Sequence, residues 1–261
     1  MTPAIQVNGV TRRFAKPSGE VFTALSNVDV EIAAGSFVSI VGPSGCGKST
    51  LLNLIAGLAP ADSGSIRVYG EALAGLNRRA AYMFQQDALL PWKSVLENVA
   101  LGLEFRGINR SARAATAADW IRRVGLEGFD SSYPHQLSGG MRKRAAMAQA
   151  FLVDPDILLM DEPFSALDVH TRLRMESELV SLWSGTGKTV VFVTHDLEEA
   201  IALSDEVIIL SAGPASKVAG RFSVDLPRPR NLIDIKTEPR FQEVYRVIWK
   251  TLREEVLKTH V

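Results

Sequence analysis

The hydrophobic pattern of the first part of the chain predicts two kinds of β-strand. Val28–Ile32 alternates apolar and polar residues, and Ser65–Tyr69 does the same before Gly70. Alternation of this kind is typical of antiparallel strands with one face in water. Phe37–Val41 is instead a nearly continuous apolar run, as expected for a parallel strand buried on both faces. The pattern therefore predicts an antiparallel β part beside a buried parallel sheet.

The pattern changes to helical spacing over residues 95–153. The segments SVLENVALGLEFRG and SARAATAADWIRRVGL each begin with a serine that can cap a helix. Apolar runs then return at 156–160, 189–193 and 207–210, with a helix expected at about 167–184 between the first two. We interpret the region between the two α/β parts as an inserted helical subdomain.

The last part of the chain predicts one long amphipathic helix. After Leu226 a PRPRN turn leads to a helix from about Pro239 to Lys258. We expect this helix to pack on its own domain rather than on a partner or a membrane. Its apolar stripe consists of Phe241, Tyr245, Ile248, Leu252 and Val256.

Composition and charge limit the possible partners. The chain has 261 residues, with 29 basic and 29 acidic side chains, and this balance argues against a general nucleic-acid-binding surface. The single cysteine, Cys46, excludes an internal disulfide and suits a reducing cytosol. The N-terminal residues lack the pattern of a signal peptide, and no apolar run approaches the roughly 20 residues that span a bilayer. A protein of this kind that works at a membrane must be held there by something else.

A glycine-rich loop follows the buried strand at Phe37–Val41. Residues 42–49, GPSGCGKS, fit the P-loop pattern, in which backbone N–H groups surround phosphates, the lysine reaches the β- and γ-oxygens and the last hydroxyl ligates Mg²⁺. Because Cys46 lies in this loop, we expect a bulky thiol reagent to block nucleotide binding and bound nucleotide to protect the thiol. The predicted triphosphate site comprises Gly42, Pro43, Ser44, Gly45, Cys46, Gly47, Lys48, Ser49 and Thr50.

Further polar residues follow the other apolar runs. Asp161 and Glu162 end the run DILLM; Asp161 suits Mg²⁺ binding, and Glu162 suits activation of an attacking water. Gln85 follows the apolar run 81–84, and His195 follows Thr189–Thr194. Because ligands bind outside the carboxyl ends of parallel strands, we expect all of these side chains at one edge of the sheet.

With these residues in place, the sequence resembles the ATP-binding cassette (ABC) ATPases over most of its length. Residues 137–141, LSGGM, resemble the family's signature motif, although Met141 stands where glutamine is commonest. The other motifs follow in the family's order: Phe14 as the aromatic residue that stacks on adenine, Gln85 as the Q-loop, Asp161-Glu162 as the end of Walker B, Ser165–Asp168 as the D-loop and His195 as the switch histidine.

The resemblance implies a fold and a division of the chain. The expected fold is α/β, with a P-loop NTPase core of mostly parallel sheet and helices, an N-terminal antiparallel β subdomain and an inserted helical subdomain. The expected parts are the core with its β subdomain at 1–85 and 155–225, the helical subdomain at 86–154 and a C-terminal helical extension at 226–261.

The resemblance also implies a head-to-tail dimer of two copies with ATP between them. Each ATP lies on the P-loop of one copy and is capped by Ser138, Gly139 and Gly140 of the other, with Asp168 nearby. Gln85 joins Ser49 and Asp161 at Mg²⁺, while Glu162, His195, Gln85 and Lys48 support hydrolysis. Arg142–Arg144 lie in the first turn of the predicted signature helix, where the helix dipole disfavours cations. Either neighbouring carboxylates neutralise them or the site is built to hold an anion. We expect some of the three to face water or pair with acids, and the triplet to support binding of the partner's triphosphate.

Within the family, Leu89–Trp92 and the tail LPRPR resemble the nitrate, sulfonate and taurine branch of bacterial importers. Such ATPases lie at the cytoplasmic face of the cell membrane and dock on separate permeases, and we expect the contact near Gln85–Trp92. A periplasmic binding protein delivers the substrate to the permease. Nucleic acid is not an expected partner. The alternatives are an ABC ATPase for another small-molecule permease, a non-transport ABC ATPase and a nucleotide-binding module without turnover.

Overall fold

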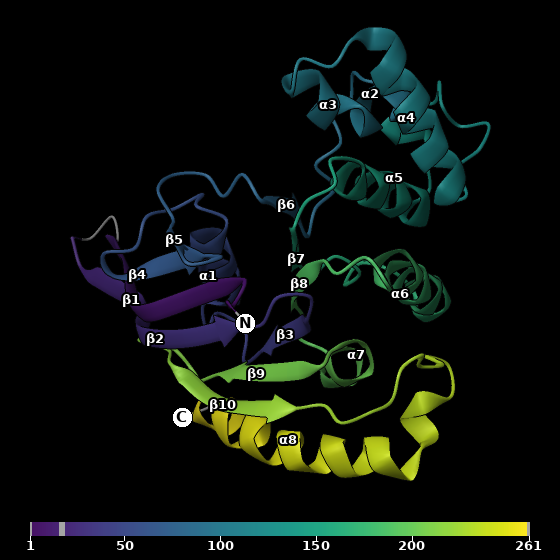
Figure 1. The fold of residues 1–261 in the computed structure, drawn as a ribbon. Coiled ribbons are helices and arrows are strands. Elements are labelled where there is room, and N and C mark those ends of the chain that lie inside the picture. The colour runs from purple at the N-terminus through teal and green to yellow at the C-terminus, as the bar shows by residue number, and fades with distance from the viewer. Residues whose placement is uncertain (1, 16–18, 260–261) are drawn as a thin grey trace.

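The buried apolar runs form a six-stranded sheet at the centre of the molecule, shown in Figure 1. The structure, a computed structural model, describes residues 2–15 and 19–259. Strands β9, β3, β8, β7 and β6 are parallel, and β10 pairs with β9 in the antiparallel direction. The order across the sheet is β10 (Val218–Ser223), β9 (Glu206–Leu210), β3 (Phe37–Val41), β8 (Thr189–Val193), β7 (Ile157–Asp161) and β6 (Ala80–Met83).

A smaller antiparallel sheet lies beside the central one. It contains β2 (Val21–Ile32), β1 (Ile5–Ala15), β4 (Ser63–Val68) and β5 (Glu71–Ala72) in that order. The sequence pattern indicated β2 and β4 but not β1, because register shifts between Val7, Val10 and Arg12 break the alternation of β1.

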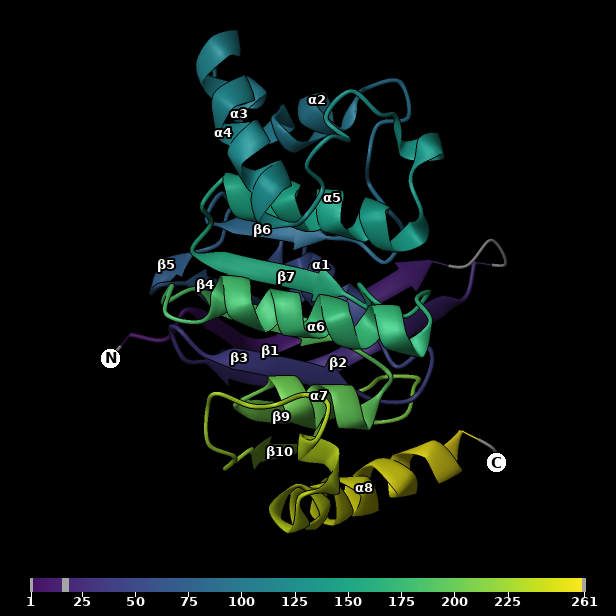
Figure 2. The same cartoon turned by 90° about the vertical axis from the view of Figure 1, so that its right-hand side faces the viewer.

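Helices cover the central sheet and form a separate layer beyond β6. Figure 2 shows α6 in front of the sheet, α8 below it and the helical part above. The helices are α1 (Lys48–Ile55), α2 (Val95–Val99), α3 (Leu101–Phe105), α4 (Arg110–Arg123), α5 (Gly139–Leu152), α6 (Val169–Trp183), α7 (Leu197–Leu203) and α8 (Pro239–Lys258), with 3₁₀ turns η1 (Pro134–Gln136) and η2 (Ile235–Thr237).

Three hydrophobic clusters hold these layers together. One joins α1 and the antiparallel sheet to one face of the central sheet, and another joins α5, α6, α7 and α8 to its other face. A third lies within the helical part and includes residues of α2, α4 and α5. Helix α5 therefore contributes to two clusters, with Phe151 packed toward the sheet and Leu152 toward the helical part.

The long helices agree with the sequence pattern, whereas the helical part differs in detail. Helix α8 has the predicted bounds, and α6 lies within the predicted range. The single helix expected after Ser94 is two short helices that meet at Ala100. Gly102 packs so closely on Val153 that a Cβ on Gly102 would collide with Val153 Cγ1, so α3 lies against the end of α5.

The predicted helix caps are partly wrong. Ser94 caps α2 as expected, in a capping box with Glu97. The cap of α4 is Asn109 rather than Ser111, because the Asn109 side chain accepts the hydrogen bond from Ala112 N at 2.9 Å.

Candidate nucleotide site

The glycine-rich loop turns sharply between β3 and α1. Gly47 has a φ of 95° and is the N-cap of α1, and a Cβ there would lie 2.8 Å from Leu25 Cδ2. Only glycine fits both the left-handed backbone and this close approach. The Lys48 ammonium is buried and donates hydrogen bonds to the carbonyl oxygens of Gly42 (2.9 Å) and Pro43 (3.1 Å). The loop thus holds a cation at the amino end of a helix, which is an anion-binding arrangement.

A hollow of about 310 Å³ opens beside this loop. It brings together Phe14 from β1, the P-loop and Glu162, residues that are far apart in the sequence. Arg12 lies over the Phe14 ring, with its guanidinium carbon 4.8 Å from the ring centre. The lining residues are Phe14, Phe22, Ala24, Ser44, Gly45, Gly47, Lys48, Ser49, Thr50 and Glu162.

Ser49 and Asp161 meet at the end of β7. The Ser49 hydroxyl donates to Asp161 Oδ1 at 2.9 Å, and burial raises the pKa of Asp161 while this hydrogen bond opposes the rise. A hydroxyl and one carboxylate are oxygen ligands of the kind that Mg²⁺ takes together with nucleotide phosphates. Within the described residues no cluster of three or more His, Cys, Asp or Glu could hold a metal alone. The residues present therefore fit a nucleotide-bound magnesium ion rather than a metal site built only of protein.

Glu162 and His195 face each other across the same edge. His195 Nδ1 lies 3.0 Å from Glu162 Oε2, and Glu162 has a φ of 43°, which is unusual for a residue with a side chain. Such a backbone persists where its surroundings hold it. Here Glu162 N donates to Val193 O at 2.9 Å, and Ser165 donates to Glu162 O. The carboxylate is thus fixed beside the hollow, where it can accept a proton from a water molecule.

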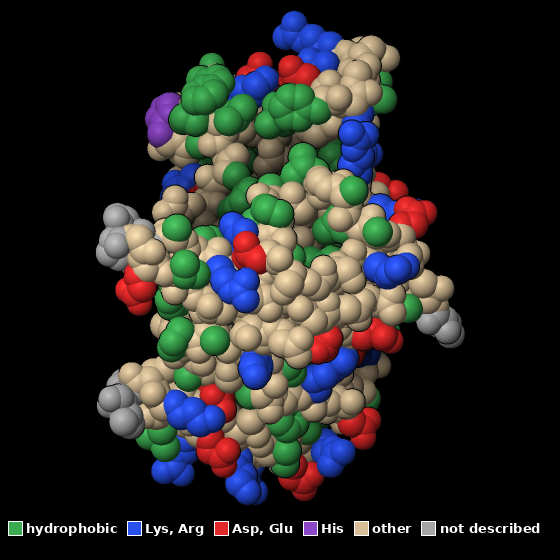
Figure 3. Space-filling view, turned by 90° about the vertical axis from the view of Figure 1, so that its left-hand side faces the viewer, with side chains coloured by type: hydrophobic (Ala, Val, Ile, Leu, Met, Phe, Trp, Pro, Cys, Tyr) green, Lys and Arg blue, Asp and Glu red, His purple; other side chains and the backbone are tan. Residues whose placement is uncertain are grey.

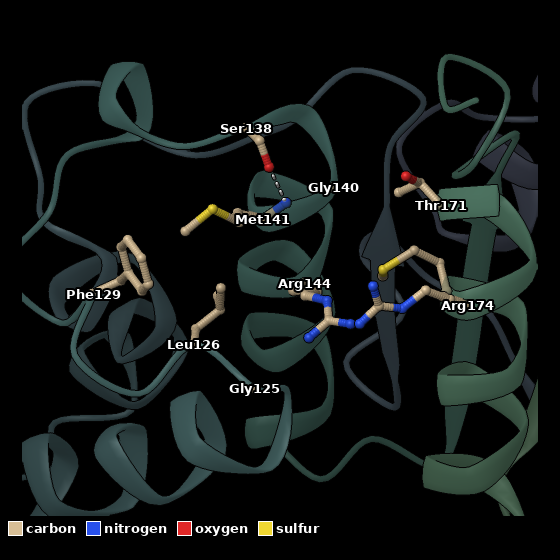
Figure 4. A pocket seen from close by; sticks show the side chains of 10 residues that line it. Gly125, Leu126, Phe129, Ser138, Gly140, Met141, Arg144, Thr171 and Arg174 are labelled. Atoms are coloured by element: carbon tan, nitrogen blue, oxygen red, sulfur yellow. Dashed lines mark hydrogen bonds between the residues drawn. The ribbon is translucent and has the colours of Figure 1, made fainter. Parts of the chain in front are cut away.

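The signature residues lie at the start of α5, in a different hollow from the P-loop. Ser138 is the N-cap of α5 and accepts a hydrogen bond from Met141 N at 3.3 Å. Figure 4 shows this second hollow, with Ser138, Gly140, Met141 and Arg144 on one side and Thr171 and Arg174 on the other. It has no lining residue in common with the P-loop hollow. One copy of the chain therefore presents the two motifs on separate surfaces.

The three cations of the signature helix are neutralised within the chain. Asp87 pairs with both Arg142 Nε (2.9 Å) and Lys143 Nζ (2.9 Å), and Arg144 pairs with Glu178 at 3.1 Å. The expected pairing of some of these cations with acids is therefore confirmed, and their support of a partner's triphosphate stays a prediction. Asp87 thus offsets the unfavourable helix dipole at Arg142, which lies in the first turn of α5.

Two other predicted residues have local roles in this chain. Gln85 is exposed and does not line the P-loop hollow, and its carbonyl oxygen accepts a hydrogen bond from Lys143 Nζ at 2.7 Å. Asp168 is the N-cap of α6 and accepts from Thr171 N at 3.0 Å. A contact of either side chain with nucleotide or metal stays a prediction.

Cys46 does not lie where a reagent can reach it. Its side chain is 0% exposed, and burial raises the pKa of its thiol. The expectation that a bulky reagent labels it in the folded protein is therefore wrong, since neither access nor the reactive thiolate is available.

Sequence reasoning missed residues that support the site from behind. The Tyr82 hydroxyl donates to Asn53 Oδ1 at 3.0 Å and lies 3.4 Å from Asp161 Oδ2. Thr194 precedes His195, and its hydroxyl accepts a hydrogen bond from Asp196 N at 3.0 Å. The position of Thr194 directly after β8 and before His195 is a signal in the sequence, whereas Tyr82 lies within β6 and has none.

The surface of the helical part is apolar in places. Figure 3 shows hydrophobic side chains gathered at the top of one face, over this part of the molecule. In and near the segment after β6, Phe84 and Trp92 are exposed, Trp92 to 71%. Among the described residues no helix is long and apolar enough to span a membrane.

The fold and the site define the class of the protein as a P-loop nucleoside triphosphatase. The sequence profile of the family described as ABC transporter matches residues 25–165, and the chain belongs to this family. It is accordingly an ATP-binding subunit that hydrolyses ATP.

Relatives cover nearly the whole chain. An uncharacterized ABC transporter ATP-binding protein of Methanocaldococcus jannaschii is 42% identical over 99% of this chain and 95% of its own length. The taurine import ATP-binding protein TauB of Rhizobium johnstonii is 44% identical over 97% of this chain and 94% of its own length. A solved structure described as a dimeric post-hydrolysis state of an ATP-binding cassette with ADP and Pi has a TM-score of 0.75, with 34% identity, over 85% of this chain and 100% of its own.

Proposed function

We propose that this chain is the ATPase subunit of a bacterial importer of a small anion such as taurine, another sulfonate or nitrate. The observation that carries the proposal is the similarity to taurine import ATP-binding proteins, at 44% identity along nearly the full chain. The apolar segment at Leu89–Trp92 supports the same branch. The periplasmic binding protein and the permease, rather than this chain, select the transported molecule.

The residues of one copy supply most of the chemistry. Lys48 and the P-loop amides hold the phosphates, and Glu162 accepts the proton of the attacking water. His195 keeps Glu162 oriented through the 3.0 Å contact and faces the γ-phosphate, which Gln85 also approaches. Ser49 and Asp161, with Gln85, would hold Mg²⁺, which would offset charge on the phosphates. Phe14 stacks on the adenine from its place in the lining of the hollow.

A second copy completes the site. Because the P-loop and the signature residues line separate hollows, a nucleotide on one copy needs Ser138, Gly139 and Gly140 of another. Two copies related head to tail satisfy both sites at once. The helix terminus at Ser138 is an anion site of the type that accepts a γ-phosphate. The dimeric state of the solved cassettes supports this arrangement.

The permease contacts this subunit near Gln85–Trp92. Phe84 and Trp92 are exposed apolar side chains within or next to this segment, as expected for a surface that another protein covers. The contact holds the ATPase at the cytoplasmic face of the membrane. Asp87 lies in the same segment and pairs with the signature helix, so the segment is joined directly to α5.

Deletion of the gene in its host tests the function. Uptake of labelled taurine, other sulfonates and nitrate is measured in the deletion strain. The strain is complemented either with the wild-type chain or, as the matched control, with Glu162→Gln. We expect loss of uptake of one of these anions, restored by the wild type only. Loss of uptake of a different small molecule would assign the chain to another permease, and unchanged uptake of all solutes would favour a non-transport ATPase.

A further inference from the structure

Two glutamates are buried together behind the switch histidine. Glu176 on α6 is 2% exposed and Glu199 on α7 is 6% exposed, and the two carboxyl groups are in hydrogen-bonding contact. Buried carboxyls are normally paired with cations or accept several hydrogen bonds. Two carboxyl groups in contact cannot both be ionised without strong repulsion, so the pair retains a proton.

Glu199 is bonded to the turn that carries His195. The Thr194 hydroxyl donates to Glu199 Oε2 and accepts from Asp196 N, so Thr194 is held from both sides. Thr194 is 2% exposed, whereas His195 between these contacts reaches out to Glu162. The position of the histidine therefore depends on a hydroxyl that Glu199 fixes.

Charges from three elements face the pair. Arg172 belongs to α6, Asp196 caps α7, and Lys236 belongs to η2 of the C-terminal extension. Each cation also forms an ion pair with another residue: Arg172 with Asp196 at 3.6 Å and Lys236 with Glu198 at 3.0 Å. Burial outweighs these charges and raises the pKa of Glu176 to about 7 and that of Glu199 to about 8. The pair titrates as a unit near and above neutral pH.

We propose that Glu199 and Glu176 are positioning residues for His195: by sharing one proton they clamp Thr194 and hold the histidine against Glu162. Loss of the shared proton leaves two carboxylates side by side in the core, which separates α6 from α7 and releases the turn. The proposal rests on the role of His195 given under the proposed function. The glutamate pair links α6, which follows the D-loop, to α7, which follows the switch histidine.

The proposal predicts a pH dependence that belongs to the pair and not to the histidine. At about pH 9 the wild type loses the shared proton and its kcat falls, while the KM for ATP stays the same because the P-loop is untouched. Glu176→Gln keeps a hydrogen-bonding partner for Glu199 without adding a second charge. Its kcat is expected within about twofold of wild type near pH 7, and about threefold higher than wild type near pH 9.

ATP hydrolysis by the full chain across this pH range is the test. Glu199→Ala should lower kcat about tenfold with unchanged KM, as expected for loss of one hydrogen bond to a positioning residue. Glu199→Gln, which retains an acceptor oxygen for Thr194, should recover most of that loss, and Glu71→Gln on the exposed β5 is the matched control with a wild-type profile. A pH profile of Glu176→Gln identical to wild type, or wild-type kcat in Glu199→Ala, would overturn the proposal.

A second readout does not depend on turnover. The chain has four histidines, and the ring resonances of His195 can be assigned with His195→Ala. In the wild type these resonances should shift between about pH 7 and pH 9 as the glutamate pair loses its shared proton, and this shift should be smaller in Glu176→Gln. An equal shift of the His195 resonances over this range in both proteins contradicts the proposal even if hydrolysis is lost for another reason. Wild-type hydrolysis by His195→Ala would instead refute the assigned role of the histidine, and with it the clamp.

Discussion

Lys143, the fifth residue of the signature helix α5, lies 2.9 Å from Asp87 in the segment that follows β6. The same Lys143 ammonium donates to Gln85 O at 2.7 Å, and its side chain is 5% exposed. Asp87 also pairs with Arg142. The Asp87 carboxylate therefore offsets two of the three cations near the start of α5, and it joins the segment at Gln85–Trp92 to this helix.

Replacing Asp87 with asparagine should destabilise the protein. The change leaves the buried Lys143 cation without its carboxylate. Because the side chain at position 87 is still partly accessible to water, we expect the free energy of unfolding to fall by about 2 kcal/mol. Urea denaturation measures the loss. Asp119→Asn is the matched control, because Asp119 pairs with Arg122 and Arg123 on an exposed helix surface, where about 0.5 kcal/mol is expected. Equal losses in the two variants would show that the Asp87 pairs have no special weight.

Replacing Glu162 with glutamine should remove the chemical step. The amide cannot accept a proton from water, so the rate of phosphate release should fall by about 10²-fold or more. ATP affinity should change little, since Lys48, Ser49 and Phe14 remain in place. Phosphate release and equilibrium binding of a fluorescent ATP analogue separate the two effects. Asp161→Asn is informative beside it, because loss of the Mg²⁺ ligand should weaken nucleotide binding as well.

Cys46 should resist thiol reagents in the folded protein. Its side chain is buried and its raised pKa keeps the thiol protonated at neutral pH, so labelling should require local opening of the P-loop. Mass spectrometry should show slow labelling in buffer and rapid labelling in denaturant. Rapid stoichiometric labelling without denaturant would contradict the position of Cys46.

The buried glutamate pair should make stability depend on pH. The pKa of an unfolded glutamate is about 4.3, and the native values for Glu176 and Glu199 are about 7 and about 8. Between these limits the native state binds more protons than the unfolded state, so this contribution to stability falls as pH rises and levels off above about pH 8. The urea midpoint should therefore fall between about pH 5 and pH 8 and fall less in Glu176→Gln. An equal fall in both proteins would mean that other groups dominate.

Much of the fold could be predicted because the controlling signals are local. Phe37–Val41 is apolar throughout and is buried throughout, and Pro239 starts α8 where a proline is favoured in a helix. The cap at Asn109 and the break at Ala100 escaped prediction. The cap depends on competition between Asn109 and Ser111, and the break is followed by the close contact of Gly102 with Val153. The spacing of apolar residues reveals neither.

Some residues of the candidate site could likewise be predicted from the sequence, and others could not. The P-loop, Asp161, Glu162 and His195 follow strand ends, so the topology of the parallel sheet was enough to bring them together. Asp87 and Glu176 look like ordinary surface acids in the sequence. Their roles arise from partners 55 or 56 residues away for Asp87 and from packing between two helices for Glu176. Contacts of this kind are decided by tertiary packing and have no local pattern.

The most direct test of the account is the mass of Glu162→Gln in solution with ATP. Size-exclusion chromatography with multi-angle light scattering should give the 28.4 kDa monomer without nucleotide and twice that mass with Mg-ATP. The dimer should persist because this variant binds ATP but does not hydrolyse it. Adding Ser138→Arg should abolish the dimer while ATP still binds to the P-loop, since the arginine blocks the helix terminus that caps the partner's nucleotide. A Glu162→Gln, Ser138→Arg double variant that dimerises with ATP as fully as Glu162→Gln would contradict the shared site.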